Sequence, residues 1–429
     1  MSSTDPAEAG SRSPGRSPLA FIFLTVFIDL LGFGIVIPLL SVYSEAYGAS
    51  TRELGLLFGC FSGMQFVFAP MWGRLSDRIG RRPVLIGGLL GTAGSYLLFG
   101  FANSMTLLFA SRLLAGFFGA NISTAQAYIA DVTTPENRAK GMGLIGAAFG
   151  LGFTLGPWIG GELAAVSPAM PGFLAAALSL TAAIFGYLKL PEPPRERRAS
   201  SRLFRLDQAR HAARDGRIGI VLLLSFAVIF WWSSFETMFL IFGLREFPAV
   251  FGLDTAVEHA TRHDIIRAAP IAGRYMGFIG IMAAIIQGGL IRRLVPRFGE
   301  TVLAVAGPAF LAIAFLVLGL APTWAIVIVA CAITPLGFGL NNPALQGLVS
   351  RASPQAEQGA YLGMNQSILS LARMTGPVTA GFLFDSLGPR SPFLFGSAAL
   401  VGCALLAAWY HARYGRTFPR AARTGAAEA

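Results

Sequence analysis

Four ionisable side chains lie deep inside long apolar stretches of this chain: Asp29, Arg112, Glu236 and Arg373. A charge near the centre of a bilayer costs about 3 kcal/mol on insertion scales, so such residues are candidates for function. Asp29 lies about 15 Å along a helix that starts at Leu19, which places it close to the membrane midplane. Burial there favours the neutral carboxyl group, which can then bind and release a proton.

These charges form two candidate pairs. Arg112 is expected within reach of Asp29, which leaves two interpretations of Asp29: a site of proton coupling, or a permanently ionised structural partner of Arg112. Glu236 and Arg373 are the corresponding pair in the second half, where Arg373 neutralises either Glu236 or a substrate anion. We assign proton coupling to Asp29, Arg112 and Glu236.

Aromatic and amide side chains near these charges are candidates for binding a substrate together with Glu236 and Arg373. Trp231 and Trp232 precede Glu236, and this combination suits a cation or a large amphipathic ligand, although tryptophan is also enriched at membrane interfaces. Amides inside membrane helices either bind a ligand or hydrogen-bond a neighbouring helix. The amide candidates are Asn121, Gln126, Asn341, Gln346, Asn365 and Gln366.

The composition places these residues in a membrane protein. The 429 residues are 54% hydrophobic and only 13% charged, and apolar stretches of about 20 residues recur, each long enough to cross a bilayer. We predict an all-α protein with twelve transmembrane helices in two six-helix bundles. The helices are expected near residues 19–43, 53–73, 83–102, 105–128, 140–162, 170–190, 218–243, 273–294, 301–320, 323–349, 359–384 and 391–411.

The distribution of basic residues predicts the topology. The net charge of +11 is not pooled on one face, which argues against nucleic-acid binding; arginine and lysine alternate between loops. The positive-inside rule makes the arginine-rich loops and both termini cytoplasmic. The predicted domains are a disordered tail (1–18), a first bundle (19–190), a basic linker (191–217), a second bundle (218–411) and a tail (412–429).

An internal repeat supports two related bundles. Asn121 and Gln126 recur as Asn341 and Gln346, and Gly156-Pro157 recurs as Gly376-Pro377, each 220 residues later. Such a repeat is typical of transporters in which the substrate path lies between the two halves.

Three motifs then carry a family resemblance. The first is the GRLSDRIGRR loop, with Gly73, Asp77, Gly80, Arg81 and Arg82; the second is the RLLAG sequence that starts at Arg112; the third combines Gly152, Gly156, Pro157, Gly160 and Gly161. Together they resemble the major facilitator superfamily, and the third resembles its drug:proton antiporters. The FIDLLGFGIVIPLL sequence is similar to the tetracycline-exporter branch.

The resemblance implies roles for these motifs. Asp77 would meet the start of the eleventh helix, and Arg81 would pair with Asp131. Through these contacts the loop, which also contains Gly73 and Arg82, would latch the two bundles together on the cytoplasmic side. Alternatively, the arginines only determine the topology. Gly152, Gly156, Gly160 and Gly161 would form a groove beside the bent position at Pro157, at the contact with the second bundle.

The sequence also departs from this branch. The second-half loop, GGLIRRLVPRFGE, has no acid near where Asp77 would map. Ser95, Leu311 and Ala283 stand where tetracycline exporters carry two acids and a histidine, which argues against tetracycline itself as the substrate.

These observations predict a proton-coupled exporter of amphipathic small molecules or drugs in a bacterial inner membrane, working as a monomer by alternating access and not as an enzyme. Its partners would be a small-molecule substrate and the lipid bilayer, with a proton gradient as energy source and no cofactor. The alternatives are a same-fold carrier of a metabolite such as a sugar or organic acid, and a non-transporting receptor or scaffold.

The segment from Asp254 to Ala269 is expected to form a short helix outside the membrane. Thr255 and Glu258 have the spacing of a capping box. His259 and His263 are four residues apart, but no HExxH pattern or nearby cysteine accompanies them, so we expect no metal site.

Overall fold

The computed structural model describes residues 18–193, 215–354 and 358–415, except 121 and 134. Within these residues the chain is helical and contains no strand. The first half contains α1 (Pro18–Ala46), α2 (Thr51–Ile79), α3 (Arg81–Gly100), α4 (Met105–Gly119), α5 (Ile122–Val132), α6 (Pro135–Val166) and α7 (Met170–Lys189). The second half contains α9 (Gly216–Glu246), η1 (Pro248–Phe251), η2 (Val257–His259), α10 (Arg262–Arg267), α11 (Ala269–Ile285), η3 (Ile286–Leu290), α12 (Ile291–Phe298), α13 (Glu300–Leu320), α14 (Trp324–Ala352), α15 (Gln358–Leu387) and α16 (Ser391–Tyr414).

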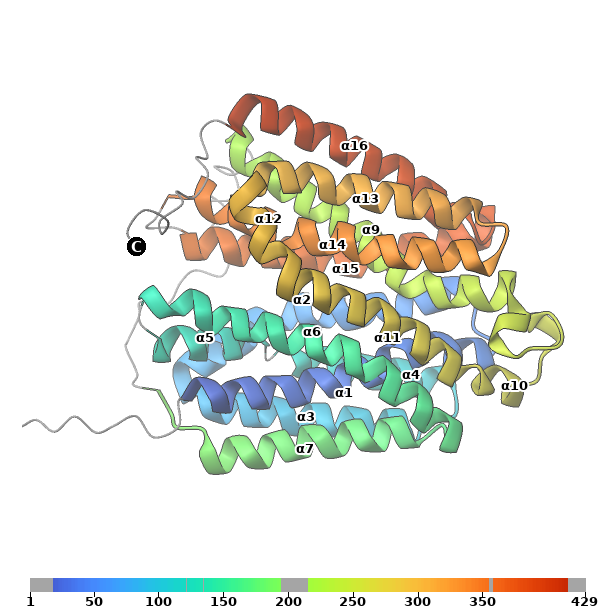
Figure 1. Ribbon diagram of the computed structural model, residues 1–429. Coiled ribbons are helices and arrows are strands. Elements are labelled where there is room, and N and C mark those ends of the chain that lie inside the picture. The colour runs from blue at the N-terminus through green and yellow to red at the C-terminus, as the bar shows by residue number, and fades with distance from the viewer. Residues whose placement is uncertain (1–17, 121, 134, 194–214, 355–357, 416–429) are drawn as a thin grey trace, which may run out of the picture.

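Each half is a bundle of long helices lying side by side (Figure 1). Ten described segments are long and apolar enough to cross a membrane; α4 with α5, and α10 with α11, each count as one of them. Helices α6 and α15, with 32 and 30 residues, bring the total to the twelve expected segments. The prediction of an all-α membrane protein built from two six-helix bundles is confirmed, whereas the domain limits remain predictions because 1–17, 194–214 and 416–429 lie outside the described residues.

The eighth segment differs from its expected form. Its helix begins at Ala269 rather than near residue 273, passes into a π-helix over Ile286–Leu290, and continues as α12 to Phe298. The π-helix contains Gly288 and Gly289, and residues without side chains tolerate this wider turn. Simple apolar length could not show this change of helix type.

The two bundles meet at one end of the molecule. We call the end that carries α10, η1 and η2 the α10 end, and the opposite end, where α7 finishes and α9 begins, the linker end (Figure 1). Tyr43 of α1 and Phe239 of α9 belong to one hydrophobic core shared by both bundles. Nearer the linker end, the core around Tyr128 contains only first-bundle residues and the core around Leu348 only second-bundle residues. The described side chains therefore join the bundles toward the α10 end and not at the linker end.

Candidate functional site

Asp29 lies near the middle of α1, in contact with α7. The Ser179 hydroxyl donates a hydrogen bond to Asp29 Oδ1 at 3.1 Å, and Ser179 itself is fully buried. Asp29 is only half-buried. The carboxyl group is thus held by a neutral donor rather than by a base, and sequence reasoning did not identify Ser179 because a lone serine in an apolar helix carries no pattern.

Arg112 is enclosed by aromatic rings. Its side chain is 1% exposed, and its guanidinium carbon lies 5.8 Å from the centre of the Tyr96 ring and 5.5 Å from that of Phe99. Among the described residues, Nε and Nη2 have no hydrogen-bond partner. The expected direct pair with Asp29 is absent from the described contacts, because the guanidinium packs on ring faces, which attract cations, while Asp29 binds Ser179.

Glu236 of α9 and Arg373 of α15 lie near enough for their charges to interact, although no hydrogen bond or ion pair between them is among the described contacts. Both side chains are half-buried. Trp232, one turn before Glu236, stacks on Phe338 with 3.9 Å between ring centres. Trp231 and Trp232 lie midway along α9, packed against the shared core, which is unlike the position of an interface anchor at a helix end.

The amide candidates separate by burial. Asn341 and Asn365 are 2% and 3% exposed, and their Oδ1 atoms have no hydrogen-bond partner among the described residues. Both line a small pocket between α9, α14 and α15, whose wall also contains Asn342 and Gln346. Gln366 is exposed and Gln126 half-buried, while Asn121 lies outside the described residues.

The segment from Gly73 to Arg82, expected as a loop, is the last part of α2, a turn at Gly80 and the start of α3, and it is braced within the first bundle. Arg81 Nε lies 2.9 Å from Asp131 Oδ2, and Arg81 Nη1 lies 2.6 Å from Asp77 Oδ1. Asp77 remains 60% exposed, and the close contacts between α2 and α15 involve the half of α2 opposite Asp77, at Gly55, Gly59 and Thr51. The expected meeting of Asp77 with the start of α15 is thus absent from the described contacts of this arrangement.

Glu192 instead caps a helix beside this loop. Its carboxylate accepts hydrogen bonds from the backbone N–H groups of Arg81, at 2.7 Å, and Arg82, at 3.0 Å, at the start of α3. Gly80 has φ +112°, and a Cβ there would collide with this carboxylate. The Arg82 guanidinium donates to the carbonyl of Tyr187 and lies over its ring. Sequence reasoning did not identify this cap, because the only signal for Glu192 was its position just after α7.

The glycine motif of α6 contacts both bundles. A Cβ built at Gly152, Gly156 or Gly160 would collide with the backbone of α1, in the same bundle. Gly161 instead meets Ala269 and Gly273 of α11, in the second bundle. The groove expected only at the contact between bundles therefore also seats α1.

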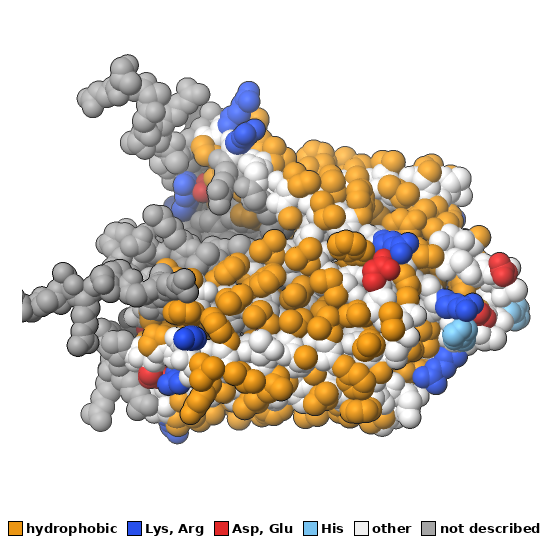
Figure 2. Space-filling view, turned by 60° about the horizontal axis from the view of Figure 1, so that its bottom comes forward, with side chains coloured by type: hydrophobic (Ala, Val, Ile, Leu, Met, Phe, Trp, Pro, Cys, Tyr) orange, Lys and Arg blue, Asp and Glu red, His pale blue; other side chains and the backbone are white. Residues whose placement is uncertain are grey.

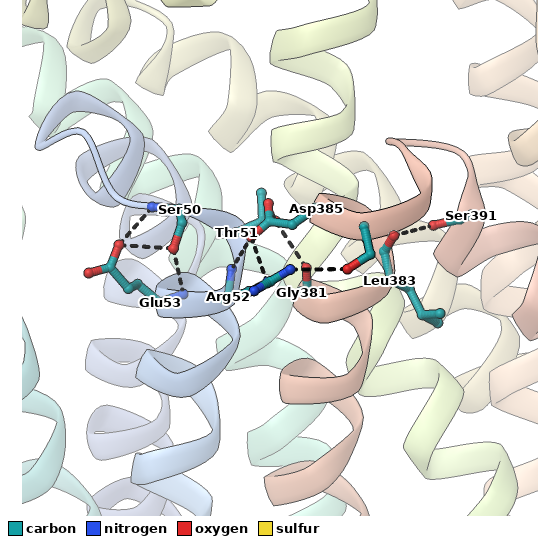
Figure 3. A network of polar contacts seen from close by, with 9 residues as sticks. Ser50, Thr51, Arg52, Glu53, Gly381, Leu383, Asp385 and Ser391 are labelled. Atoms are coloured by element: carbon teal, nitrogen blue, oxygen red, sulfur yellow. Dashed lines mark hydrogen bonds and ion pairs between the residues drawn. The ribbon is translucent and has the colours of Figure 1, made fainter.

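Three ion pairs join the bundles at the α10 end. Arg52 Nε lies 3.4 Å from Asp385 Oδ2, and the Thr51 hydroxyl donates to Asp385 and, at 3.1 Å, to the carbonyl of Gly381 (Figure 3). The others connect Arg245 with Glu45, at 3.1 Å between Nη2 and Oε1, and Arg274 with Glu162, at 2.7 Å between Nε and Oε1. The side chains of Arg274 and Glu162 are 61% and 41% exposed, and Figure 2 shows that one face of the molecule is mainly apolar with few charged groups.

The segment at the α10 end forms helices, but the proposed capping box was wrong. Thr261 caps α10 and pairs reciprocally with Asp264, whereas the region of Thr255 and Glu258 forms only a turn and η2. The members of each pair are three positions apart, so spacing alone could not choose between the two pairs. Among the described residues, no group of three or more metal-ligating side chains occurs.

Comparison with known proteins agrees with this architecture. The family model described as Major Facilitator Superfamily matches residues 22–377 and 276–428. The chain is 32% identical to Multidrug resistance protein 1 of Bacillus subtilis over 91% of its own length and 96% of that protein. It is 31% identical to Tetracycline resistance protein, class C, of Escherichia coli, over 91% of this chain and 94% of that protein.

A solved structure shows the same arrangement. The human organic anion transporter MFSD10 has a TM-score of 0.70 and 26% identity, covering 92% of this chain and 100% of that one. Fold and relatives define a multi-pass membrane transporter and not an enzyme. The chain belongs to the major facilitator superfamily, and the resemblance to its drug-exporter branch is confirmed.

Proposed function

We propose that this protein exports amphipathic small molecules from a bacterial cell in exchange for protons, by alternating access between its two bundles. The observation that carries the proposal is the pair of half-buried carboxyl groups, Asp29 and Glu236, one in each bundle, on helices that also line the contact between bundles. A carboxyl group inside a membrane can couple transport to a proton gradient because its charged form is costly there. Export is also supported by the relatives that are named multidrug and tetracycline resistance proteins.

In this proposal the described arrangement is the inward-facing state. The linker end lies at the cytoplasm of an inner membrane, as the arginine-rich loops predict, and the α10 end is shut by the three ion pairs. Aromatic side chains such as Trp231 and Trp232 bind the apolar body of the substrate, and Glu236 attracts its cationic group.

Transport of an organic acid is the second candidate function. It is favoured by Arg112, which is buried and has two guanidinium nitrogens without a described partner, because a carboxylate ligand would satisfy them. One solved relative is named an organic anion transporter. Tetracycline is disfavoured, since Ser95 and Leu311 are buried and uncharged.

Reconstituted protein in proteoliposomes distinguishes these functions. Three probes would be supplied: ethidium as a cation, benzoate as an anion, and tetracycline as the drug for which some relatives are named. Transport of each probe would be measured with an imposed pH gradient, without a gradient, and after addition of an uncoupler. We expect gradient-dependent movement of ethidium that the uncoupler abolishes. Movement of benzoate alone would establish the second candidate, and ethidium movement that ignores the gradient would refute coupling.

A further inference from the structure

An ion pair recurs at the same place in both halves of the repeat. In the first half, Arg81 begins α3 and pairs with Asp131 near the end of α5. In the second half, Glu300 begins α13, and its Oε2 lies 3.2 Å from Nη1 of Arg351 near the end of α14. Glu300 follows Arg81 by 219 residues and Arg351 follows Asp131 by 220, which matches the 220-residue repeat. The acid and the base have exchanged places.

The backbone around the two pairs is also alike. Gly80, with φ +112°, precedes Arg81, and Gly299, with φ +82°, precedes Glu300. Each pair thus ties the first residue after a tight turn to the end of the next long helix. In both pairs the acid is largely shielded, with side-chain exposures of 20% for Asp131 and 13% for Glu300. Such shielding strengthens an ion pair relative to one in open water.

The position that corresponds to Asp77 differs between the two halves. Arg81 also bonds Asp77, with 2.6 Å between Nη1 and Oδ1, and the Ser76 hydroxyl. The residue 219 positions after Asp77 is Pro296, which has no charge. The second-half segment therefore retains an ion pair, although it has no acid at the position of Asp77.

We propose that Glu300 and Arg351 are positioning residues that brace the linker end of the second bundle with charges opposite to those of the first-bundle pair, and that the first bundle cannot exchange its charges in this way. Glu300 also packs beside Gly347, where an added Cβ would lie 3.2 Å from its Cγ, so the brace holds the part of α14 that carries Asn341 and Gln346. The constraint in the first bundle comes from Asp77, because an acid in place of Arg81 would face a second carboxylate there. Only the effect on transport rests on the proposed function.

Charge reversal tests the brace in purified protein. Glu300→Arg and Arg351→Glu each place like charges together, and each is expected to lower Tm by about 2 °C. The double reversal is expected to restore at least half of the summed loss. If the two losses simply add, the brace is refuted, since a pair that interacts must show coupling. If either protein cannot be purified, the milder Glu300→Gln, Arg351→Gln and their double variant provide the same cycle.

The first bundle provides the matched comparison. Arg81→Glu combined with Asp131→Arg is expected to remain destabilised, because the introduced carboxylate would face that of Asp77; adding Asp77→Asn should then restore stability. Full rescue by the reversal alone would refute the constraint by Asp77.

Ethidium efflux from proteoliposomes measures the positioning role. The second-bundle reversal should retain the half-saturating ethidium concentration of the unaltered protein, whereas each single reversal should raise it several-fold. Unchanged values in the single variants would refute positioning. No ethidium movement in any variant, including the unaltered chain, would count against the proposed function, and Tm would still decide the brace.

Discussion

At the scale of residues, the two carboxyl groups are held in different ways. Asp29 has a hydrogen bond from Ser179 and no described base, whereas Glu236 interacts with Arg373. Arg112, which the sequence paired with Asp29, packs on Tyr96 and Phe99. A carboxyl group without a basic partner is the better candidate for a proton that comes and goes, because no fixed cation stabilises its charged form.

We therefore expect Asp29→Asn to abolish proton-driven transport while the protein still folds. Asparagine has nearly the same shape and can still accept from Ser179, but it cannot exchange a proton. The measurement is gradient-driven ethidium movement in proteoliposomes, with counterflow of ethidium at equal pH as the control that should persist. Undiminished gradient-driven movement in the variant would show that Asp29 does not carry the proton.

At the scale of elements, close approach of helices depends on the α6 glycines. Gly156 lies against the backbone of Gly34 and Ile35 in α1, and Gly161 lies against α11. Small residues permit such contacts, and packing is a main source of helix association in a bilayer. Helix α6 thus packs against α1, which carries Asp29, and also contacts the second bundle.

Gly156→Leu should lower Tm and transport, because the added side chain would overlap the α1 backbone; overpacking of this kind typically costs about 1–3 kcal/mol. Gly150→Leu is the matched control, since a Cβ at Gly150 meets nothing within 4 Å. Thermal unfolding in detergent compares the two. Equal Tm values for the two variants would mean that the α1–α6 contact accommodates the leucine side chain without loss of stability.

At the scale of the whole molecule, the two ends are unequal. The α10 end has the shared core and the ion pairs between bundles, while Asp77 at the linker end bonds only within its own bundle among the described contacts. A contact made in one state alone shifts the populations of the two states by its own free energy. Each end should therefore respond to loss of its contacts in the opposite sense.

Asp385→Asn should loosen the α10 end. It weakens the contacts with Thr51 and Arg52, and a loss of about 1 kcal/mol changes the ratio of states about fivefold. An impermeant maleimide added on the α10 side of vesicles should label a cysteine at Val378, which packs against Gly55 and Gly59, about fivefold faster. Glu53→Gln, in the capping box of α2 beside this contact, should leave the labelling rate unchanged. An equal rise of the rate in Asp385→Asn and Glu53→Gln would show that the contacts of Asp385 do not specifically hold the α10 end closed.

Asp77→Asn should have the opposite effect, if Asp77 caps the start of α15 when the linker end closes. Losing that cap, typically worth about 1 kcal/mol, favours the described arrangement. A cysteine at Gln358, in a background without Cys60, Cys331 and Cys403, should then react several-fold faster. Asp77→Glu retains the charge and should restore the slow rate, whereas identical rates in all three proteins would make Asp77 a solvated loop charge.

The sequence alone determined the twelve-helix architecture, the two related halves and the position of the buried charges. These features follow from apolar length, from the cost of charge in a bilayer and from the 220-residue repeat, all of which are local or periodic properties of the chain. The Arg81–Asp131 contact was also predicted, through the family resemblance, and it is present.

Only the tertiary structure shows which residues far apart in the sequence contact each other. Asp29 meets Ser179, 150 residues away, Glu192 caps α3, and Asp385 meets Thr51 across the bundles. Each contact depends on the rotation of one helix about its axis and on how far it slides along another, and an apolar stretch surrounded by lipid and protein specifies neither. Which end of the molecule the bundles share likewise depends on contacts between residues far apart in the sequence, such as Arg52 with Asp385.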